Sequence, residues 1–375
     1  MSWRVPLADV LVTDEDIAAV VETYRGGWLS MGPRTEALEE AFASYTGARH
    51  ALAVANGTAA LHLACLAAGL GPGDEVVVPS LTFVATVNAI AYTGARPVFA
   101  DIAGLEEPWL SADAAAAAIG PRTSAIMTVA YGGHPGETAA LSELADRRDV
   151  LLLEDAAHAA GSRLGGRHLG TFGVAGAFSF FSNKNLAIGE GGMVVTDDDE
   201  VARTIRLLRS HGMTTLTWDR HRGHASTYDV VTLGYNYRID EPRAALALQR
   251  LRRLDEENER RRGHTRRYRA ALASTEGLTV ALAPPEGAVS AEHLFTVVLD
   301  PEVDRERFRA ALAAKGVQTS VHYPPVHRFS FYAEGAAGLP VTDAYATRTV
   351  TLPLFAHMSD EQVEVVIESV LAAVA

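Results

Sequence analysis

The chain has 375 residues, which suggests two domains at about 100–200 residues per domain. Its 33 basic and 46 acidic residues give a formal net charge of −13, which argues against general nucleic-acid or anionic-membrane binding. The single cysteine, Cys65, excludes an intramolecular disulfide and a four-cysteine metal site, and we predict no metal. The N-terminal residues lack the apolar core of a signal peptide, so we expect a cytoplasmic protein.

Strand-like and helix-like segments alternate through the first part of the chain. Apolar runs that are typical of buried strands cover residues 51–55, 76–79, 94–101, 125–129 and 150–155. The segments between them are long enough for helices, and Cys65 lies in one of these as an expected core residue. This alternation predicts an α/β fold with a mostly parallel central sheet flanked by helices. Ligands of such sheets bind at the carboxyl ends of strands.

The first candidate site is Asn56-Gly57-Thr58, between an apolar strand and a helix. Glycine lets the backbone approach a ligand closely, and the first N–H groups of a helix favour an anion. The motif therefore predicts a phosphate site, with the hydroxyl of Thr58 as an additional donor. The alternative is an ordinary turn followed by a helix cap.

The second candidate is Lys184, which lies between the apolar run 177–181 and the glycine-rich turn 189–192. Another apolar run, 193–195, follows the turn. A strand, a loop and a returning strand would hold this amine at a buried sheet edge. Burial disfavours the ammonium form, and a neutral amine can form a Schiff base. The alternative is a surface lysine in a glycine-rich hairpin.

Asp155 ends a strongly apolar strand, and His158 follows about one helical turn later. A desolvated carboxylate needs a cationic or hydrogen-bonding partner, and a protonated pyridine nitrogen would serve. Asp155 could instead cap the next helix, and His158 could be a structural histidine.

The remainder of the chain predicts a second domain. A long helix from Glu241 to about Ala271 carries interleaved arginines and acidic residues, which indicates a solvated helix face. Short strands and helices follow from about residue 275. We therefore expect a large α/β domain over residues 1–245, then the connecting helix and a smaller C-terminal α+β domain over residues 246–375. The polar insert at 213–224 is interpreted as a substrate loop.

Six motifs occur in the order in which one enzyme family carries them. They are Asn56-Gly57-Thr58-Ala59-Ala60-Leu61, Pro79-Ser80-Leu81-Thr82-Phe83, Glu154-Asp155-Ala156-Ala157-His158, Phe178-Ser179-Phe180 with Lys184-Asn185-Leu186 and Gly189-Glu190-Gly191-Gly192, Gly234-Tyr235-Asn236-Tyr237-Arg238, and His322-Tyr323-Pro324-Pro325. With these motifs, nearly the whole chain resembles the DegT/DnrJ/StrS family of aminotransferases. These enzymes depend on pyridoxal 5′-phosphate (PLP) and have the fold of aspartate aminotransferase, known as fold type I.

The resemblance implies a role for each matching residue. Lys184 would form the Schiff base and move the proton, and Asp155 would pair with the pyridine nitrogen of PLP. His158 would contact the cofactor ring or its hydroxyl. The remaining cofactor contacts would be a stacking ring and three phosphate ligands: Phe83, Gly57, Thr58 and Ser179.

The resemblance also implies a homodimer with shared active sites. An asparagine in the position of Asn236 would reach the phosphate of the neighbouring subunit's cofactor. The predicted partners are otherwise small molecules, namely an amino donor and a keto-sugar nucleotide, with no nucleic acid and no membrane.

The implied reaction is a ping-pong transfer from glutamate or glutamine through pyridoxamine phosphate (PMP). The form of residues 180–186 is similar to that of the branch whose acceptors are keto-deoxyhexoses linked to dTDP, UDP or GDP. The alternatives are a keto-cyclitol aminotransferase acting on a scyllo-inosose-type substrate, another PLP reaction such as elimination, and a PLP-binding regulatory protein without turnover. The candidate substrate contacts are Trp28, Arg220, Arg222, His322, Tyr323, His327 and Arg328. For Trp28 the alternative interpretation is packing in the core.

Overall fold

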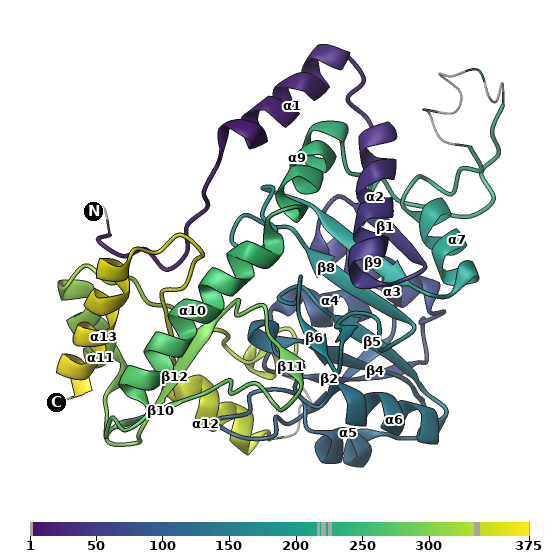
Figure 1. Cartoon of the computed structure of the whole chain (residues 1–375). Helices are drawn as coiled ribbons and strands as arrows, with labels where there is room; N and C mark the ends of the chain where they lie inside the picture. The colour runs from purple at the N-terminus through teal and green to yellow at the C-terminus, as the bar shows by residue number, and fades with distance from the viewer. Residues whose placement is uncertain (1–2, 216–217, 219–222, 224–226, 334–337, 375) are drawn as a thin grey trace.

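The computed structural model describes residues 3–215, 218, 223, 227–333 and 338–374 (Figure 1). A seven-stranded sheet with the order β1-β9-β8-β5-β4-β2-β3 lies at its centre. β9 is antiparallel to both of its neighbours, and all other neighbouring pairs are parallel, which confirms the mostly parallel sheet. The strands are β1 (His50–Val54), β2 (Glu75–Pro79), β3 (Arg96–Ala100), β4 (Thr123–Val129), β5 (Leu151–Asp155), β8 (Ala175–Ser179) and β9 (Gly192–Thr196).

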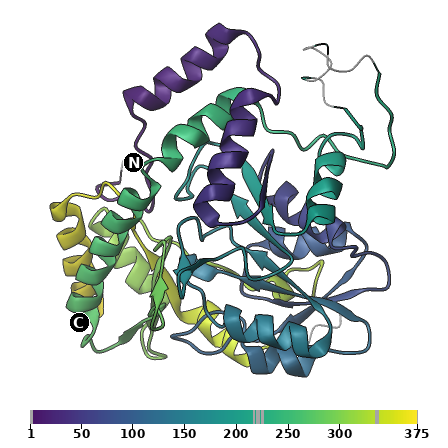
Figure 2. The ribbon, with the colours of Figure 1, turned by 45° about the vertical axis from the view of Figure 1, so that its right-hand side comes forward.

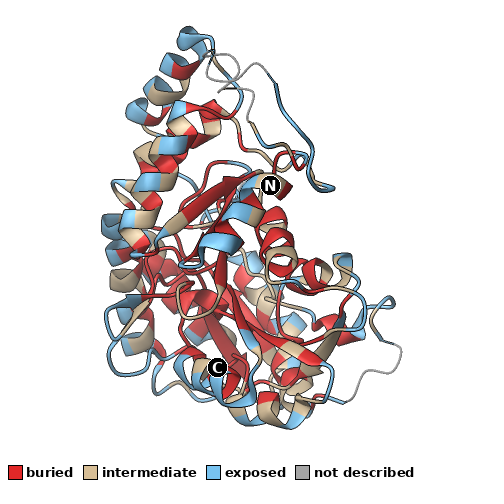
Figure 3. Ribbon diagram, turned by 90° about the vertical axis from the view of Figure 1, so that its right-hand side faces the viewer, coloured by how far each residue is buried: buried red, intermediate tan, exposed pale blue. Residues whose placement is uncertain are grey.

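Helices cover both faces of this sheet. Side chains alternate along β1, so that Leu52 and Val54 join one apolar cluster while Ala51 and Ala53 join another. Figure 3 shows the sheet strands buried and the surrounding helices exposed on their outer sides. On one face pack α3 (Gly57–Ala67), α4 (Val84–Tyr92) and α7 (Asp199–Leu208); on the other pack α2 (Pro33–Thr46), α5 (Ala112–Ala118), α6 (Thr138–Arg148) and α9 (Glu241–Leu251).

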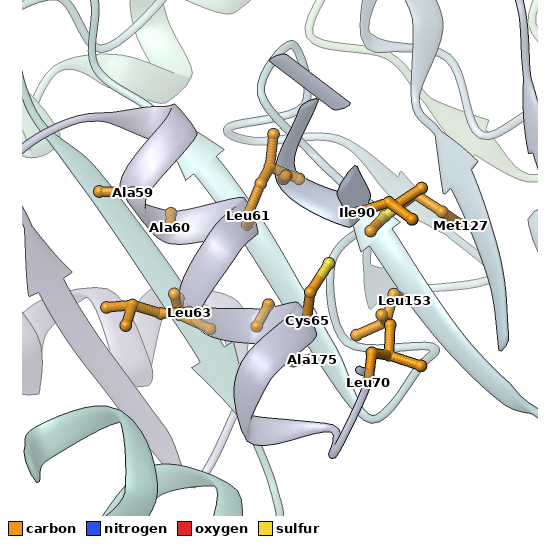
Figure 4. Close-up of a cluster of buried hydrophobic side chains, with 14 of the residues drawn as sticks. Ala59, Ala60, Leu61, Leu63, Cys65, Leu70, Ile90, Met127, Leu153 and Ala175 are labelled. Carbon is orange, nitrogen blue, oxygen red and sulfur yellow. The ribbon is translucent and has the colours of Figure 1, made fainter. Parts of the chain in front are cut away.

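Cys65 is part of the core, as the sequence predicts. It is fully buried in α3, in a cluster that includes Leu63, Ile90 and Met127 (Figure 4). Burial raises the pKa of the Cys65 thiol to about 12, so this side chain is an inert core residue.

A smaller α+β unit follows, on the left of Figure 1 and again in Figure 2. The strands β10 (Leu278–Val280), β12 (Phe295–Leu299) and β13 (Thr349–Leu352) form an antiparallel sheet. Its apolar core also includes Val5, which bridges Val317, so the start of the chain packs against this second unit. The helices α11 (Arg305–Ala314), α12 (Pro340–Arg348) and α13 (Asp360–Val374) surround the sheet, and β11 (Ala288–Val289), β6 (Arg163–Leu164) and β7 (Arg167–His168) form a further sheet.

The single long helix that the sequence predicts is wrong, because the segment forms two helices. α9 ends at Leu251, and α10 (Leu254–Leu272) begins after Arg253, whose backbone has φ −111° and ψ 3°. Arg250 and Arg253, on the two sides of this break, both bind the buried carboxylate of Asp16. The segment holds no proline at the break, so its sequence does not mark where α9 ends.

The prediction of a solvated arginine face holds for only part of this segment. Arg260 and Arg266 are exposed and pair with acidic residues of α10. Arg250 and Arg261 are buried, because they face the N-terminal segment and the interior.

Among the described residues, no helix is both long enough and apolar enough to span a membrane.

A buried carboxylate caps α2, and its removal should destabilise the protein. Glu241 accepts hydrogen bonds from the backbone N–H groups of Gly32, Arg34 and Thr35 at 2.7–2.9 Å. In Glu241→Gln one acceptor becomes an NH₂ group that faces a donor, which should cost about 1–3 kcal/mol. Urea unfolding of the apoprotein measures this cost. The exposed residue Glu40, in the same helix, provides the control Glu40→Gln, and an equal loss in both variants would contradict the capping role.

Candidate active site

A cavity of about 490 Å³ lies where several parallel strands end. Side chains that follow β1, β2, β5 and β8 converge on it, as expected for the carboxyl ends of a parallel sheet. His322 and Tyr323 line it from the C-terminal part of the chain. Of the predicted residues, it is lined by Gly57, Thr58, Phe83, Asp155, His158, Ser179, Lys184, His322 and Tyr323.

The loop at Gly57 forms a cradle that only glycine allows. A Cβ atom added to Gly57 would lie 2.7 Å from the Cβ of Ser179, and one added to Gly192 would lie 2.5 Å from the carbonyl oxygen of Asn56. α3 begins at Gly57, and the side chain of Asn56 accepts the N–H of Ala59 at 2.8 Å. The other first-turn N–H groups have no partner within the helix, so this end of the cavity suits an anion.

Asp155 places a buried carboxylate on the cavity wall. Its Oδ2 accepts from the hydroxyl of Thr86 at 2.6 Å, and its Oδ1 accepts from the N–H of Ala157 at 3.0 Å. Burial raises the pKa of Asp155, while these hydrogen bonds and the nearby Lys184 act in the opposite direction. A cation in the cavity would stabilise the ionised carboxylate, as expected for a partner of a protonated pyridine nitrogen.

Lys184 lies in the loop between β8 and β9, and its backbone N–H donates to the carbonyl of Phe181 at 2.8 Å. β8 and β9 are interior strands, so the amine sits at strand ends rather than beside an edge strand. Its side chain lines the cavity and is only half-buried. Burial lowers the pKa of Lys184 to about 8, against the opposing effect of the Asp155 carboxylate. A large fraction of this amine is therefore neutral near pH 8.

Aromatic rings complete the cavity. Phe83 is 57% exposed in the cavity wall, and its ring centroid lies 5.9 Å from that of Tyr323. Tyr323 is hydrogen-bonded to Nε2 of His158 at 3.1 Å, and Nδ1 of His158 accepts the N–H of Gly132 at 3.2 Å. Burial holds the pKa of His158 well below its usual range, so this ring is neutral. The exposed face of Phe83 is available to stack on a flat ligand.

Three of the other predicted substrate residues lie outside this lining. His327 is buried, with Nδ1 2.7 Å from the hydroxyl of Ser80, and Arg328 binds Asp343. Trp28 packs against Trp218, with ring centroids 4.7 Å apart. Within one chain, the surroundings of Trp28 therefore agree with the packing interpretation.

Asn236 is exposed and also lies outside the cavity lining. Arg220 and Arg222 lie outside the described residues, so their predicted contacts stay predictions. The described residues contain no group of three or more His, Cys, Asp or Glu side chains that could hold a metal ion.

Sequence reasoning missed several residues of the site. Phe181, Asn183 and Glu190 line the cavity on both sides of Lys184 in the chain, and this proximity was a usable signal. Thr86, which binds Asp155, is 69 residues away from it in sequence. No local pattern indicates a contact of that kind.

The residues present fit PLP. The cradle at Gly57 and Ser179 suits its phosphate, Phe83 offers a face for its ring, Asp155 suits the pyridinium, and Lys184 offers a half-buried amine. The fold and the site together define a PLP-dependent transferase of fold type I.

Comparison with known sequences identifies the family of this transferase. The sequence profile of the DegT/DnrJ/EryC1/StrS aminotransferase family matches residues 11–371, and the chain belongs to this family. It is a PLP-dependent aminotransferase.

Individual relatives agree with this assignment. The spore coat polysaccharide biosynthesis protein SpsC of Bacillus subtilis (strain 168) is 41% identical over 376 residues, covering 97% of this chain and 96% of SpsC. The aminotransferase TlmJ from Streptoalloteichus hindustanus superposes with a TM-score of 0.92 and 37% identity, covering 98% of both chains. Spr1654 from Streptococcus pneumoniae, solved in a PMP form, has a TM-score of 0.92 and 27% identity, covering 99% of both chains.

Proposed function

We propose that this aminotransferase moves an amino group from glutamate or glutamine to a keto group of a nucleotide-linked keto-deoxyhexose. The observation that carries the proposal is the convergence of Lys184 and Asp155 on one cavity of about 490 Å³. SpsC, a relative over nearly the whole chain, is described as a polysaccharide biosynthesis protein, which favours a sugar acceptor. A keto-cyclitol of the scyllo-inosose type is the second candidate acceptor.

The residues of the chain divide the work of this reaction. When bound, PLP supplies a conjugated ring that takes up the electron pair released at the substrate carbon. Asp155 stabilises a positive charge on the part of a ligand that lies beside the end of β5. Phe83 fixes the plane in which a ring of the ligand can lie. Lys184 removes the proton from the donor carbon in one half of the reaction and supplies a proton to the acceptor carbon in the other half, because its pKa of about 8 lets one amine do both near neutral pH.

A substrate screen tests this function. Each keto-sugar nucleotide and scyllo-inosose is incubated with the enzyme and one amino donor, and the products are identified by mass spectrometry. Amination of a keto-sugar nucleotide is the expected result. Amination of only scyllo-inosose would favour the cyclitol alternative. Recovery of PMP after glutamate alone distinguishes transamination from elimination and from a regulatory protein without turnover.

We also propose that two copies of the chain share their active sites. Asn236 is exposed, and the segment before it presents apolar side chains to solvent: Val231 is 55% exposed and Leu233 is 85% exposed. Solvent-exposed apolar side chains of this size favour a protein–protein contact. Burial of this segment against a second copy would bring Asn236 toward the phosphate end of the partner's cavity.

This arrangement predicts that Leu233→Glu weakens the dimer. A carboxylate at the centre of an apolar contact would be desolvated, so the variant should be monomeric at micromolar concentration and lose most of its activity. Sedimentation velocity measures the oligomeric state. The control is Leu371→Glu in α13, where the leucine is partly exposed on the smaller unit. A Leu233→Glu variant that remained dimeric and fully active would contradict the proposal.

A further inference from the structure

The side chain of Asn185, next to Lys184, is buried and makes three hydrogen bonds. Its Nδ2 donates to Oδ1 of Asn258 at 2.7 Å and to the carbonyl oxygen of Ala291 at 2.8 Å. Its Oδ1 lies 2.9 Å from Nδ1 of His293. These contacts join the lysine loop to α10 and to the segment that precedes β12.

Two backbone carbonyls fix the orientation of both amides. A carbonyl can only accept, so Ala291 requires the NH₂ group of Asn185 to face it. In the same way the carbonyl of Ala160, 2.9 Å from Nδ2 of Asn258, leaves Oδ1 of Asn258 facing Asn185. The remaining oxygen of Asn185 is then an acceptor, and Nδ1 of His293 must donate to it.

The tautomer of His293 has a consequence for the cavity. Its ring centroid lies 4.2 Å from that of His158, which lines the cavity. His158 accepts from Gly132 at Nδ1, so its Nε2 carries the proton and donates to Tyr323. His158 is therefore neutral with a defined tautomer, and burial holds the pKa of His293 well below its usual range, so this second ring is neutral too. Neutral rings suit this place, because a positive charge on either histidine would lie close to the amine of Lys184 and repel its ammonium form.

The groups that face Lys184 come from several elements. Asp155 ends β5 and favours the ammonium form, while the pKa values of His158, His293 and His322 are all lowered in part by the charge of Lys184. From α10, the buried guanidinium of Arg261 acts on His293 in the same direction. The amine therefore has one carboxyl group and several neutral imidazoles around it.

We propose that Asn185 is a positioning residue for Lys184: its amide fastens the lysine loop to α10 and Ala291 and orients the ring of His293, which packs against His158 beside the amine. This rests on the proposed role of Lys184 in proton transfer. Loss of the amide would free the loop, admit water and make the ammonium form easier to accommodate. The chain offers a direct way to measure this, because Lys184 and Lys315 are its only two lysines.

The experiment uses the apoprotein in a Lys315→Arg background, where Lys184 is the only lysine. Its modification by an amine-reactive reagent is followed by mass spectrometry as a function of pH. Half-maximal reactivity is expected near pH 8 in the background protein. In Asn185→Leu, which removes all three hydrogen bonds, this midpoint should rise by at least about one pH unit. In the holoenzyme kcat should fall about 10–100-fold, with KM for the amino donor changed less than about twofold.

Asn88→Leu is the matched control, because Asn88 accepts a hydrogen bond from Tyr332 outside the lysine loop. It should leave the midpoint in place. Should Asn185→Leu fail to fold, Asn185→Ala serves instead; it removes the same three hydrogen bonds without adding a charge and should also raise the midpoint. Unchanged midpoint and kcat in the Asn185 variant that folds, with only a lower melting temperature, would overturn the proposal. The labelling needs no cofactor, so it stays informative even if wild-type protein shows no linkage of PLP to Lys184.

Discussion

Replacing Lys184 with alanine is expected to lower the rate of amino transfer by at least about 10⁴-fold. In the proposed mechanism the variant loses both the amine that links covalently to the cofactor and the group that moves the proton, and proton transfer alone contributes about 10²–10⁴-fold. PLP should still bind through the cradle at Gly57 and Ser179. The complex should lack the absorption band of a protonated Schiff base at about 410–430 nm. Absorption spectra and single-turnover kinetics measure the two losses.

The control for this variant is Lys315→Arg. Lys315 is exposed at the end of α11, outside the cavity lining, so its replacement should leave the band and kcat unchanged. A Lys184→Ala enzyme that kept the band would remove Lys184 from its proposed role.

The same variant also changes how the apoprotein responds to pH. The pKa of Lys184 falls from 10.5 to about 8 on folding, so between these values the unfolded chain binds more protons than the folded one. The free energy of unfolding should therefore rise with pH between about 8 and 10.5. Below about pH 8 the burial of this amine should destabilise the folded protein to its full extent. Lys184→Ala should lose this rise, which urea unfolding at several pH values would show.

Replacing Asp155 with asparagine is expected to lower kcat by about 10²–10³-fold, the typical loss for one preorganised electrostatic contact. The side chain keeps its shape, and its Oδ1 can still accept from Ala157, but it no longer favours a positive charge at the end of the cavity. The linkage to Lys184 does not require this charge, so the absorption band should remain. Stopped-flow spectra of the half-reaction with glutamate would show a slowed step in a protein that still binds PLP.

Asp113→Asn is the matched control, since Asp113 is exposed in the first turn of α5. It should retain kcat. Full activity in Asp155→Asn would show that the carboxylate has no part in the reaction.

The sequence predicts the core of the site well because these residues stand at strand ends. Gly57, Phe83, Asp155 and Lys184 each follow an apolar run, and parallel strands bring their carboxyl ends to one edge. The order of the motifs then gave the cofactor. Secondary structure and family resemblance were enough for this part of the account.

Other features depend on contacts between distant segments, and sequence patterns did not predict them. His327 follows the His322-Tyr323 motif closely, yet it turns to Ser80, 247 residues away. Asp16 binds Arg250 and Arg253 beside the break between α9 and α10, and Asn185 binds Asn258 and Ala291. Each is a side-chain partnership that local periodicity does not encode.

We expect Lys184 to carry the cofactor, and borohydride reduction tests this expectation most directly. Holoenzyme is reduced, digested and mapped by mass spectrometry, and with two lysines in the chain the outcome is unambiguous. The phosphopyridoxyl group should be found on Lys184 and be absent from Lys315. Its recovery on Lys315, or its absence from both residues in protein saturated with PLP, would contradict the account.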